Sequence, residues 1–181
     1  MVRTLALIAT ALLLLSALPA RAEVTDVTPG GFISTHTQVL ALPPDEAWML
    51  LTEGLSRWWD ASHSYGLVAE NLSLKAGPGG CLCETLENGG WVEHLRVIFV
   101  QPPASLKLQG ALGPLVDMGL HGVMNWTLEP DENGGTLFTS RYVVSGHMDG
   151  GFAQLAPVVD AVNGGHFQRL ERVSKGLPAA E

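Results

Sequence analysis

The stretch "LAPVVDAVNGGHFQRLERV" (155–173) decides the fold, because its apolar residues recur at the spacing of a helix face. The residues at three- or four-residue intervals are Leu155, Val159, Val162, His166, Leu170 and Val173. This pattern predicts one long helix with a single buried face. Pro157 fits the first turn of such a helix. The pair Gly164-Gly165 predicts close packing against a neighbour or a bend.

The residues before this helix show strand and turn patterns, interrupted once by a helical stretch. Residues 43–59 open with prolines and acids, which suits a helix first turn, and Gly54 divides them into two short helices or one bent helix. Strands are expected at 32–42, 71–77, 80–87, 91–100, 105–112, 122–130 and 136–147, with turns at 88–90 and 131–135. The sequence therefore predicts an α+β domain, with helices on one face of an antiparallel sheet.

Four stretches within this order resemble a known superfamily. They are "PPDEAWMLLTEGLSRWW" (43–59), "GPGGCLCE" (77–84), "VIFVQPPASLKLQ" (97–109) and "VVDAVNGGHFQRLERV" (158–173). Together they resemble the START-like, or SRPBCC, superfamily of helix-grip folds, and most of all its branch of Hsp90-ATPase-activator homologues. The resemblance implies a curved antiparallel sheet of about six to seven strands gripping the long C-terminal helix around an apolar cavity. Its members include lipid and hormone carriers, cyclases of polyketide pathways and co-chaperone domains, so the resemblance does not fix a function.

The first residues have the pattern of an export signal. Arg3 precedes an uncharged, mostly apolar stretch from Thr4 to Leu18, and Ala20-Arg21-Ala22 is a small-x-small cleavage site. A retained membrane anchor is the alternative, but the apolar stretch is shorter than the roughly 20 residues of a spanning helix. We therefore expect cleavage after Ala22, a periplasmic or secreted protein and no membrane span afterwards. Residues 23–31 are then a loose N-terminal lead, and residues 32–177 a single domain.

The charge of the mature chain excludes two classes of partner. Without residues 1–22, which hold two basic residues and no acid, eight basic residues face 18 acidic ones, a net charge of −10. Nucleic acid and anionic lipid both require clustered Lys and Arg. Neither partner is therefore expected, and the sequence names no protein partner.

The hairpin "GGCLCETLENGGWVEH" (79–94) carries the most suggestive polar residues. A two-residue turn at Asn88-Gly89 would place Glu84 opposite Glu93, and Cys83 opposite His94; a three-residue loop would shift this register. In the first register Leu82, Glu84, Trp91 and Glu93 face the cavity, while Cys81, Cys83 and His94 face outward. Two opposed glutamates among apolar groups would raise at least one pKa, as a general acid or a polar ligand anchor requires. The alternative, which is favoured here, is that both glutamates lie near the open mouth of the cavity and stay solvated.

The two cysteines allow three interpretations. Cys81, Cys83 and His94 are possible metal ligands, but structural zinc sites usually leave two to four residues between paired cysteines. A disulfide suits an exported protein but requires a bulge, because alternate residues of a strand lie about 6.5–7 Å apart. Two half-buried free side chains are the third interpretation, and the one favoured here. No metal or other cofactor is expected.

The cavity predicted by the resemblance would be lined by apolar walls and a few polar groups. Arg141 is placed beside Trp126 if Leu128 pairs with Leu137, where it could pair with a glutamate or stack on the indole. His166 lies on the apolar face of the long helix, as a core residue or a catalyst. The expected ligand-binding residues are Trp58, Trp59, Leu82, Glu84, Trp91, Glu93, Met124, Trp126, Arg141 and His166.

Three functions remain open from the sequence. The first is an exported protein that binds a small apolar or aromatic molecule. The second is a cyclase or dehydratase with Glu84, Glu93 and His166 as candidate acids and bases. The third is an interaction module, similar to a co-chaperone domain, whose inner face is packed core. No nucleophile, metalloprotease or nucleotide-binding motif occurs, so no residue is assigned a catalytic role.

Overall fold

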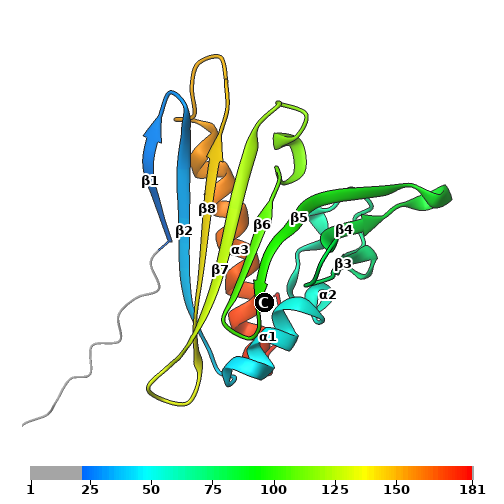
Figure 1. The fold of residues 1–181 in the computed structure, drawn as a ribbon, viewed down its shortest axis with the longest axis vertical. Helices are drawn as coiled ribbons and strands as arrows, with labels where there is room; N and C mark the ends of the chain where they lie inside the picture. Colours follow the sequence, from blue (N-terminus) through cyan, green and yellow to red (C-terminus); the bar gives the residue numbers. More distant parts are fainter. Residues whose placement is uncertain (1–21, 181) are drawn as a thin grey trace, which may run out of the picture.

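A computed structural model describes residues 22–180, which form one eight-stranded antiparallel sheet with helices on its concave face (Figure 1). The strand order is β1-β2-β8-β7-β6-β5-β4-β3. The strands are β1 (Ala22–Thr28), β2 (Gly31–Leu40), β3 (Leu72–Leu74), β4 (Cys81–Thr85), β5 (Trp91–Gln101), β6 (Ser105–Gln109), β7 (His121–Pro130) and β8 (Thr136–Ser145). The helices are α1 (Pro44–Thr52), α2 (Leu55–Trp58) and α3 (Leu155–Ser174). The α+β helix-grip prediction is confirmed.

The sheet has one strand more than the sequence predicted. Residues 23–31, expected as a loose lead, form most of β1, which pairs antiparallel with β2. The edge of β2 offers β1 a row of backbone donors and acceptors, and this pairing requires no strong side-chain pattern. The predicted signal peptide (1–22) lies outside the described residues, apart from Ala22. Within residues 22–180, no helix has the length and apolarity needed to cross a bilayer.

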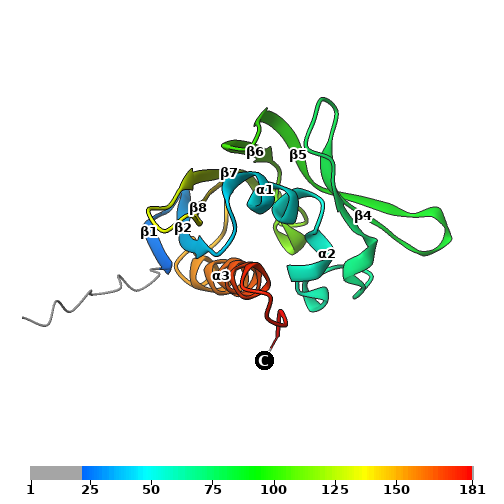
Figure 2. The ribbon, with the colours of Figure 1, turned by 90° about the horizontal axis from the view of Figure 1, so that it is seen from below.

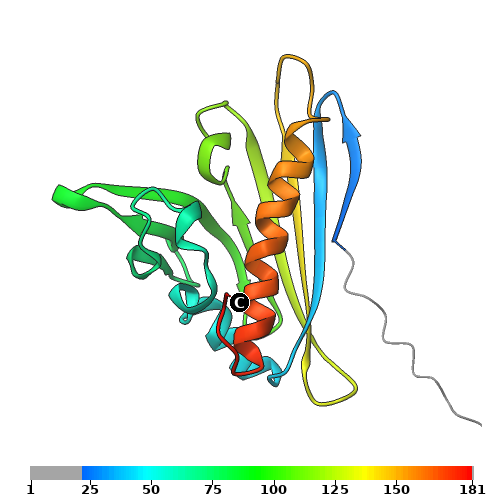
Figure 3. The same ribbon diagram turned by 180° about the vertical axis from the view of Figure 1, so that it is seen from behind.

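The long helix α3 lies across the concave face of the sheet, most closely against β2 (Figures 2 and 3). Close packing explains Gly164: a Cβ there would lie 2.9 Å from Cε1 of the buried His36 on β2. His36 is fixed in turn by Asp160 of α3, with 2.9 Å between Nε2 and Oδ1. Asp160 also accepts a hydrogen bond from Ser34. Gly164 therefore allows α3 to approach β2 closely, whereas a Cβ at Gly165 would meet nothing within 4 Å.

An aromatic cluster fills the space between α3, α2 and the sheet. Phe167 of α3 packs against Phe138 at 5.2 Å, against Trp126 at 6.3 Å and against Trp58 at 6.4 Å between ring centroids. These side chains are almost completely buried. Offset and edge-to-face pairs at these distances stabilise a core beyond their area of contact. One end of the helix–sheet interface is therefore solid core rather than cavity.

The β4–β5 hairpin adopts the three-residue loop, so the two-residue register was wrong. The Leu86 amide donates to the Gly90 carbonyl, and Asn88 and Gly89 both have left-handed φ angles. Leu82 then pairs with Leu95 and Cys83 with Glu93, so His94 is an extra residue on β5. Such a bulge turns the strand and changes which side chains face inward.

The β7–β8 hairpin also differs by one position from its predicted register. Leu128 pairs with Phe138, not with Leu137. A one-residue shift exchanges the two faces of a strand. Arg141 consequently lies opposite Asn125 and is exposed on the outer face, away from Trp126. The predicted pairing of Arg141 with a cavity glutamate is therefore wrong.

Candidate functional site

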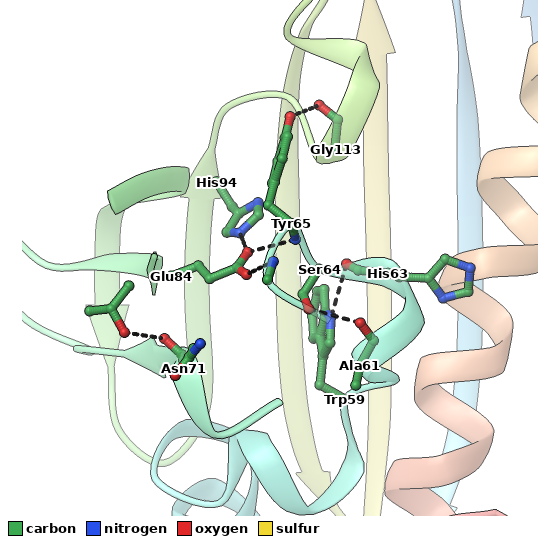
Figure 4. A network of polar contacts seen from close by, with 11 residues as sticks. Trp59, Ala61, His63, Ser64, Tyr65, Asn71, Glu84, His94 and Gly113 are labelled. Carbon is green, nitrogen blue, oxygen red and sulfur yellow. Dashed lines mark hydrogen bonds and ion pairs between the residues drawn. The ribbon is translucent and has the colours of Figure 1, made fainter. Parts of the chain in front are cut away.

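A cavity of about 490 Å³ opens between α3, the segment after α2 and the loop between β6 and β7. Its lining residues are Trp59, Ser62, His63, Ser64, Tyr65, His94, Leu112, Gly113, Pro114, Leu115, Asp117, Leu155, Val158, Val159, Val162, Asn163 and His166. The walls are mainly apolar, and the volume is within the range of small-molecule sites. The Tyr65 hydroxyl joins the two loops at the cavity by donating to the Gly113 carbonyl at 3.4 Å (Figure 4).

Glu84 organises one side of this cavity from a completely buried position, with 0% of its surface exposed. Its carboxylate accepts hydrogen bonds from the backbone amides of Tyr65 at 3.1 Å and Gly66 at 2.6 Å. The ring of His94 lies against the same group, with 3.0 Å between Nε2 and Oε2 (Figure 4). A buried carboxylate requires such partners to replace its hydration. Glu84 therefore ties the segment after α2 to the β4–β5 hairpin.

His94 faces the cavity, although the sequence placed it on the outer face of the hairpin. The bulge at His94 brings two consecutive residues of β5, His94 and Leu95, to buried positions. Because both oxygens of Glu84 accept amide hydrogens, Nε2 of His94 is the donor to this carboxylate. Nδ1 makes no hydrogen bond within residues 22–180. The lone pair of His94 Nδ1 is therefore available beside the cavity.

His166 lies on the opposite wall, as the helical pattern predicted. Its ring stacks on Trp59 at 4.0 Å between centroids, and Nδ1 accepts a hydrogen bond from the Asp60 amide at 3.2 Å. Burial, with a smaller effect of the nearby His63, lowers the pKa of His166 to about 3. The imidazole is therefore neutral at physiological pH.

The other predicted ligand contacts divide into core and surface. Trp58, Leu82, Met124 and Trp126 are buried in the core and do not line the cavity. Trp91 is 66% exposed, and Glu93 is exposed and paired with Arg96 at 3.0 Å. The bulge explains both errors, because it turns Trp91 and Glu93 to the face opposite Glu84. Of the predicted contacts, only Trp59 and His166 line the cavity.

Cys81 and Cys83 form a disulfide, so the favoured interpretation as free side chains was wrong. Their Cα atoms lie 5.4 Å apart, closer than alternate residues of a regular strand, and the bulge is directly adjacent. The bond occupies both sulfurs, which are therefore not thiolate ligands. Within residues 22–180, no group of three His, Cys, Asp or Glu is placed to hold a metal ion.

The sequence missed several residues of the cavity. Tyr65 and the loop from Leu112 to Asp117 had no periodic pattern, and only the fold brings them to α3. Asn163 could have been found, because it lies three residues before His166 and next to Val162 on the predicted helix face. Its polarity on an apolar face was the available signal.

Solved structures with a similar fold span most of this chain. EF2215 from Enterococcus faecalis, a conserved protein of unknown function, is 13% identical with a TM-score of 0.60, and the match covers 84% of this chain and 76% of that one. CalU16 from Micromonospora echinospora is 16% identical with a TM-score of 0.57, covering 89% and 87%. MLL2253 from Mesorhizobium loti is 19% identical with a TM-score of 0.56, covering 80% and 97%. These likenesses show the fold alone.

Sequence comparison gives a family as well. The family model described as "Polyketide cyclase / dehydrase and lipid transport" matches residues 32–175. Among curated proteins, none matches the chain significantly.

Proposed function

The chain belongs to the family of polyketide cyclases, dehydrases and lipid-transport proteins, and on that premise we propose that it binds a small, mainly apolar molecule in the cavity beside α3. The cavity itself is the observation that carries this proposal. Leu155, Val158, Val159 and Val162 form one wall, and Leu112 and Leu115 face them from the β6–β7 loop. Burying an apolar ligand between such walls is favourable by about 25 cal/mol per Å² of apolar surface removed from water.

Filling the cavity tests this proposal directly. Val162 lines the cavity, whereas the preceding residue, Ala161, is exposed on the solvent side of α3. We expect Val162→Trp to abolish binding of the neutral fluorescent probe N-phenyl-1-naphthylamine. The matched variant Ala161→Trp adds the same side chain outside the cavity and should bind like the wild type. Equal binding by both variants, or no binding by the folded wild type, would contradict the proposal.

Acid–base catalysis is a second candidate function, favoured by the Glu84–His94 pair. A histidine oriented by a buried carboxylate, with its second nitrogen beside a cavity, is the arrangement of a general base. His94 replaces two residues predicted for this role: Glu93 lies on the outer face, and His166 has a strongly lowered pKa. The interaction-module hypothesis is less favoured, because the inner face is not completely filled.

Proton exchange would reveal such a base without a known substrate. For 2-acetylnaphthalene in D₂O, Nδ1 of His94 would take a methyl proton, the C–H electron pair would form the enolate, and solvent would return a deuteron. We expect the wild type to accelerate deuterium incorporation, measured by NMR, and His94→Phe to lose this acceleration. Equal rates for the two proteins would reject the catalytic role.

We also propose that the protein is exported and cleaved after Ala22. The Cys81–Cys83 disulfide supports this location, because such bonds persist in oxidising compartments. An exported carrier would not meet the cytosolic partners of an Hsp90 activator. We therefore propose no co-chaperone role from the resemblance to the Hsp90-ATPase-activator homologues. N-terminal sequencing of protein from the cell envelope or medium should begin at Glu23. A chain still carrying Met1 in the cytosol would contradict export.

A further inference from the structure

Two buried hydrogen-bond donors on α3 have no acceptor within the described residues. They are Nδ2 of Asn163, whose residue is 3% exposed, and Nε2 of His166, whose residue is 2% exposed. Both residues line the cavity. A buried donor without an acceptor is costly, and most buried polar groups in folded proteins are satisfied. Two such groups in one cavity wall therefore point to an acceptor supplied from outside the chain.

The hydrogen on His166 can be assigned to a particular nitrogen. Nδ1 accepts the hydrogen bond from the Asp60 amide, so the neutral ring carries its hydrogen on Nε2. The side chain is held in this orientation by stacking on Trp59. Both unpartnered groups are consequently uncharged N–H donors, one from an amide and one from an imidazole.

The charges around the cavity favour a neutral acceptor. Within the described part of the chain, the lining contains no Lys or Arg, and its one acid is Asp117. The nearby Arg169 is engaged by the Trp58 carbonyl at 3.0 Å and by Asp60 at 3.7 Å, and it does not line the cavity. A carboxylate ligand would lose its hydration without gaining a cation. A neutral carbonyl oxygen would lose less hydration free energy on binding, and it could accept hydrogen bonds from both Asn163 and His166.

The spacing of the two donors suits a single functional group. Residues three apart on a helix are neighbours on one face, with roughly 5–6 Å between their Cβ atoms. A carbonyl oxygen has two lone pairs and can therefore accept from both side chains. We propose that Asn163 and His166 form a recognition site for an uncharged carbonyl oxygen on an otherwise apolar ligand. This inference rests on the proposed ligand-binding function and names the chemical class of the ligand.

Three naphthalene probes of similar size test the inference. 2-Acetylnaphthalene carries a neutral carbonyl, 2-ethylnaphthalene carries none, and 2-naphthoate carries a charge. By calorimetry, we expect the ketone to bind the wild type roughly ten- to hundredfold more tightly than the hydrocarbon, at about three- to tenfold for each of the two hydrogen bonds. The ketone should also bind more tightly than the carboxylate. The ¹⁵N-bound proton signals of Asn163 Nδ2 and His166 Nε2 should shift downfield with the ketone only.

Variants locate the effect at these two residues. Asn163→Leu keeps the size of the side chain and removes the donor, so it should reduce ketone affinity by roughly three- to tenfold and leave hydrocarbon affinity equal or higher. Asn125→Leu is the matched control, because Asn125 also has an unpartnered buried atom but lies outside the cavity. It should change neither affinity. His166→Phe should reduce ketone affinity as Asn163→Leu does. If the His166→Phe variant does not fold, the Nε2 proton signal of His166 in the wild type tests the role of this residue instead.

The outcomes separate this inference from the function on which it rests. If ketone and hydrocarbon bind equally and the proton signals of Asn163 Nδ2 and His166 Nε2 do not shift, the carbonyl site is refuted while the apolar cavity stands. If 2-naphthoate binds most tightly, the site recognises an anion and the inference is wrong. If none of the three probes binds the folded wild type, the ligand-binding proposal fails and the carbonyl site fails with it.

Discussion

His94 and Glu84 meet across the β4–β5 hairpin, with 3.0 Å between Nε2 and Oε2, and both side chains are buried. The same carboxylate accepts hydrogen bonds from the amides of Tyr65 and Gly66, which belong to the segment after α2. The buried Glu84 carboxylate thus connects the β4–β5 hairpin with the segment after α2 and orients His94, the candidate base (Figure 4). The stability of the cavity wall should depend on this group.

Removing the carboxylate should therefore destabilise the protein strongly. Glu84→Leu removes the acceptor of two backbone amides and of the buried His94 ring. We expect the free energy of unfolding to fall by about 3 kcal/mol, measured by urea titration. Glu84→Gln retains one acceptor oxygen and should cost less. Glu87→Leu, at an exposed position beyond the same strand, is the control and should cost less than about 0.5 kcal/mol. Similar losses for Glu84→Leu and Glu87→Leu would refute the role given to Glu84.

The two adjacent glycines of α3 should respond oppositely to alanine. Gly164→Ala places a Cβ 2.9 Å from Cε1 of His36, which is fixed by Asp160, so overpacking should cost about 1–3 kcal/mol. At Gly165 a Cβ meets nothing within 4 Å, and the better helix propensity of alanine should stabilise by up to about 1 kcal/mol. Thermal unfolding of the two variants gives the comparison. A higher melting temperature for Gly164→Ala than for Gly165→Ala would show that α3 is not packed as described.

Acid should destabilise the protein partly through His166. Burial lowers its pKa from an ordinary value of 6.5 to about 3 in the folded state. Between these two pH values the unfolded chain binds a proton at His166 that the folded chain does not bind. The contribution of His166 to the free energy of unfolding is therefore complete above about pH 6.5. It decreases as the pH falls toward 3, by up to about 1.4 kcal/mol per pH unit. Burial also lowers the pKa of His36, against the opposing effect of Asp160, and His36 adds a loss of the same sign.

The variant His166→Phe isolates this contribution. Urea unfolding between about pH 7 and about pH 4.5 should show a shallower decrease of stability for His166→Phe than for the wild type. His36 titrates in both proteins and serves as an internal control. Parallel pH profiles would mean that the pKa of His166 is not lowered in the folded state.

The disulfide should contribute modestly to stability, because it closes a very short loop. Chain entropy predicts a loss of about 1–2 kcal/mol for the double variant Cys81→Ser/Cys83→Ser. In the exported protein, alkylation without prior reduction should label neither cysteine, as mass spectrometry would show. Complete labelling of both residues would contradict the oxidised state and weaken the proposal of export.

The sequence was sufficient for the fold because the long helix and the turns have strong local patterns. The face of α3 carrying Val159, Val162 and His166 was predicted correctly, and it forms one wall of the cavity. The hairpin faces were not predictable, because a single extra residue at His94 reverses them and leaves no mark in the alternation of residues. Glu84 was placed on the inner face, but opposite Glu93, and the favoured expectation that it stays solvated was wrong. Contacts between segments remote in sequence, such as Tyr65 with Gly113, have no local signal.

The central claim is that the cavity beside α3 holds a small apolar molecule. Native mass spectrometry of the protein purified from its own cells, compared with Val162→Trp and Ala161→Trp prepared in the same way, tests it most directly. We predict a bound small molecule on the wild type and on Ala161→Trp, and none on Val162→Trp. A wild type without any bound mass, or an equal bound mass on Val162→Trp, would contradict the claim.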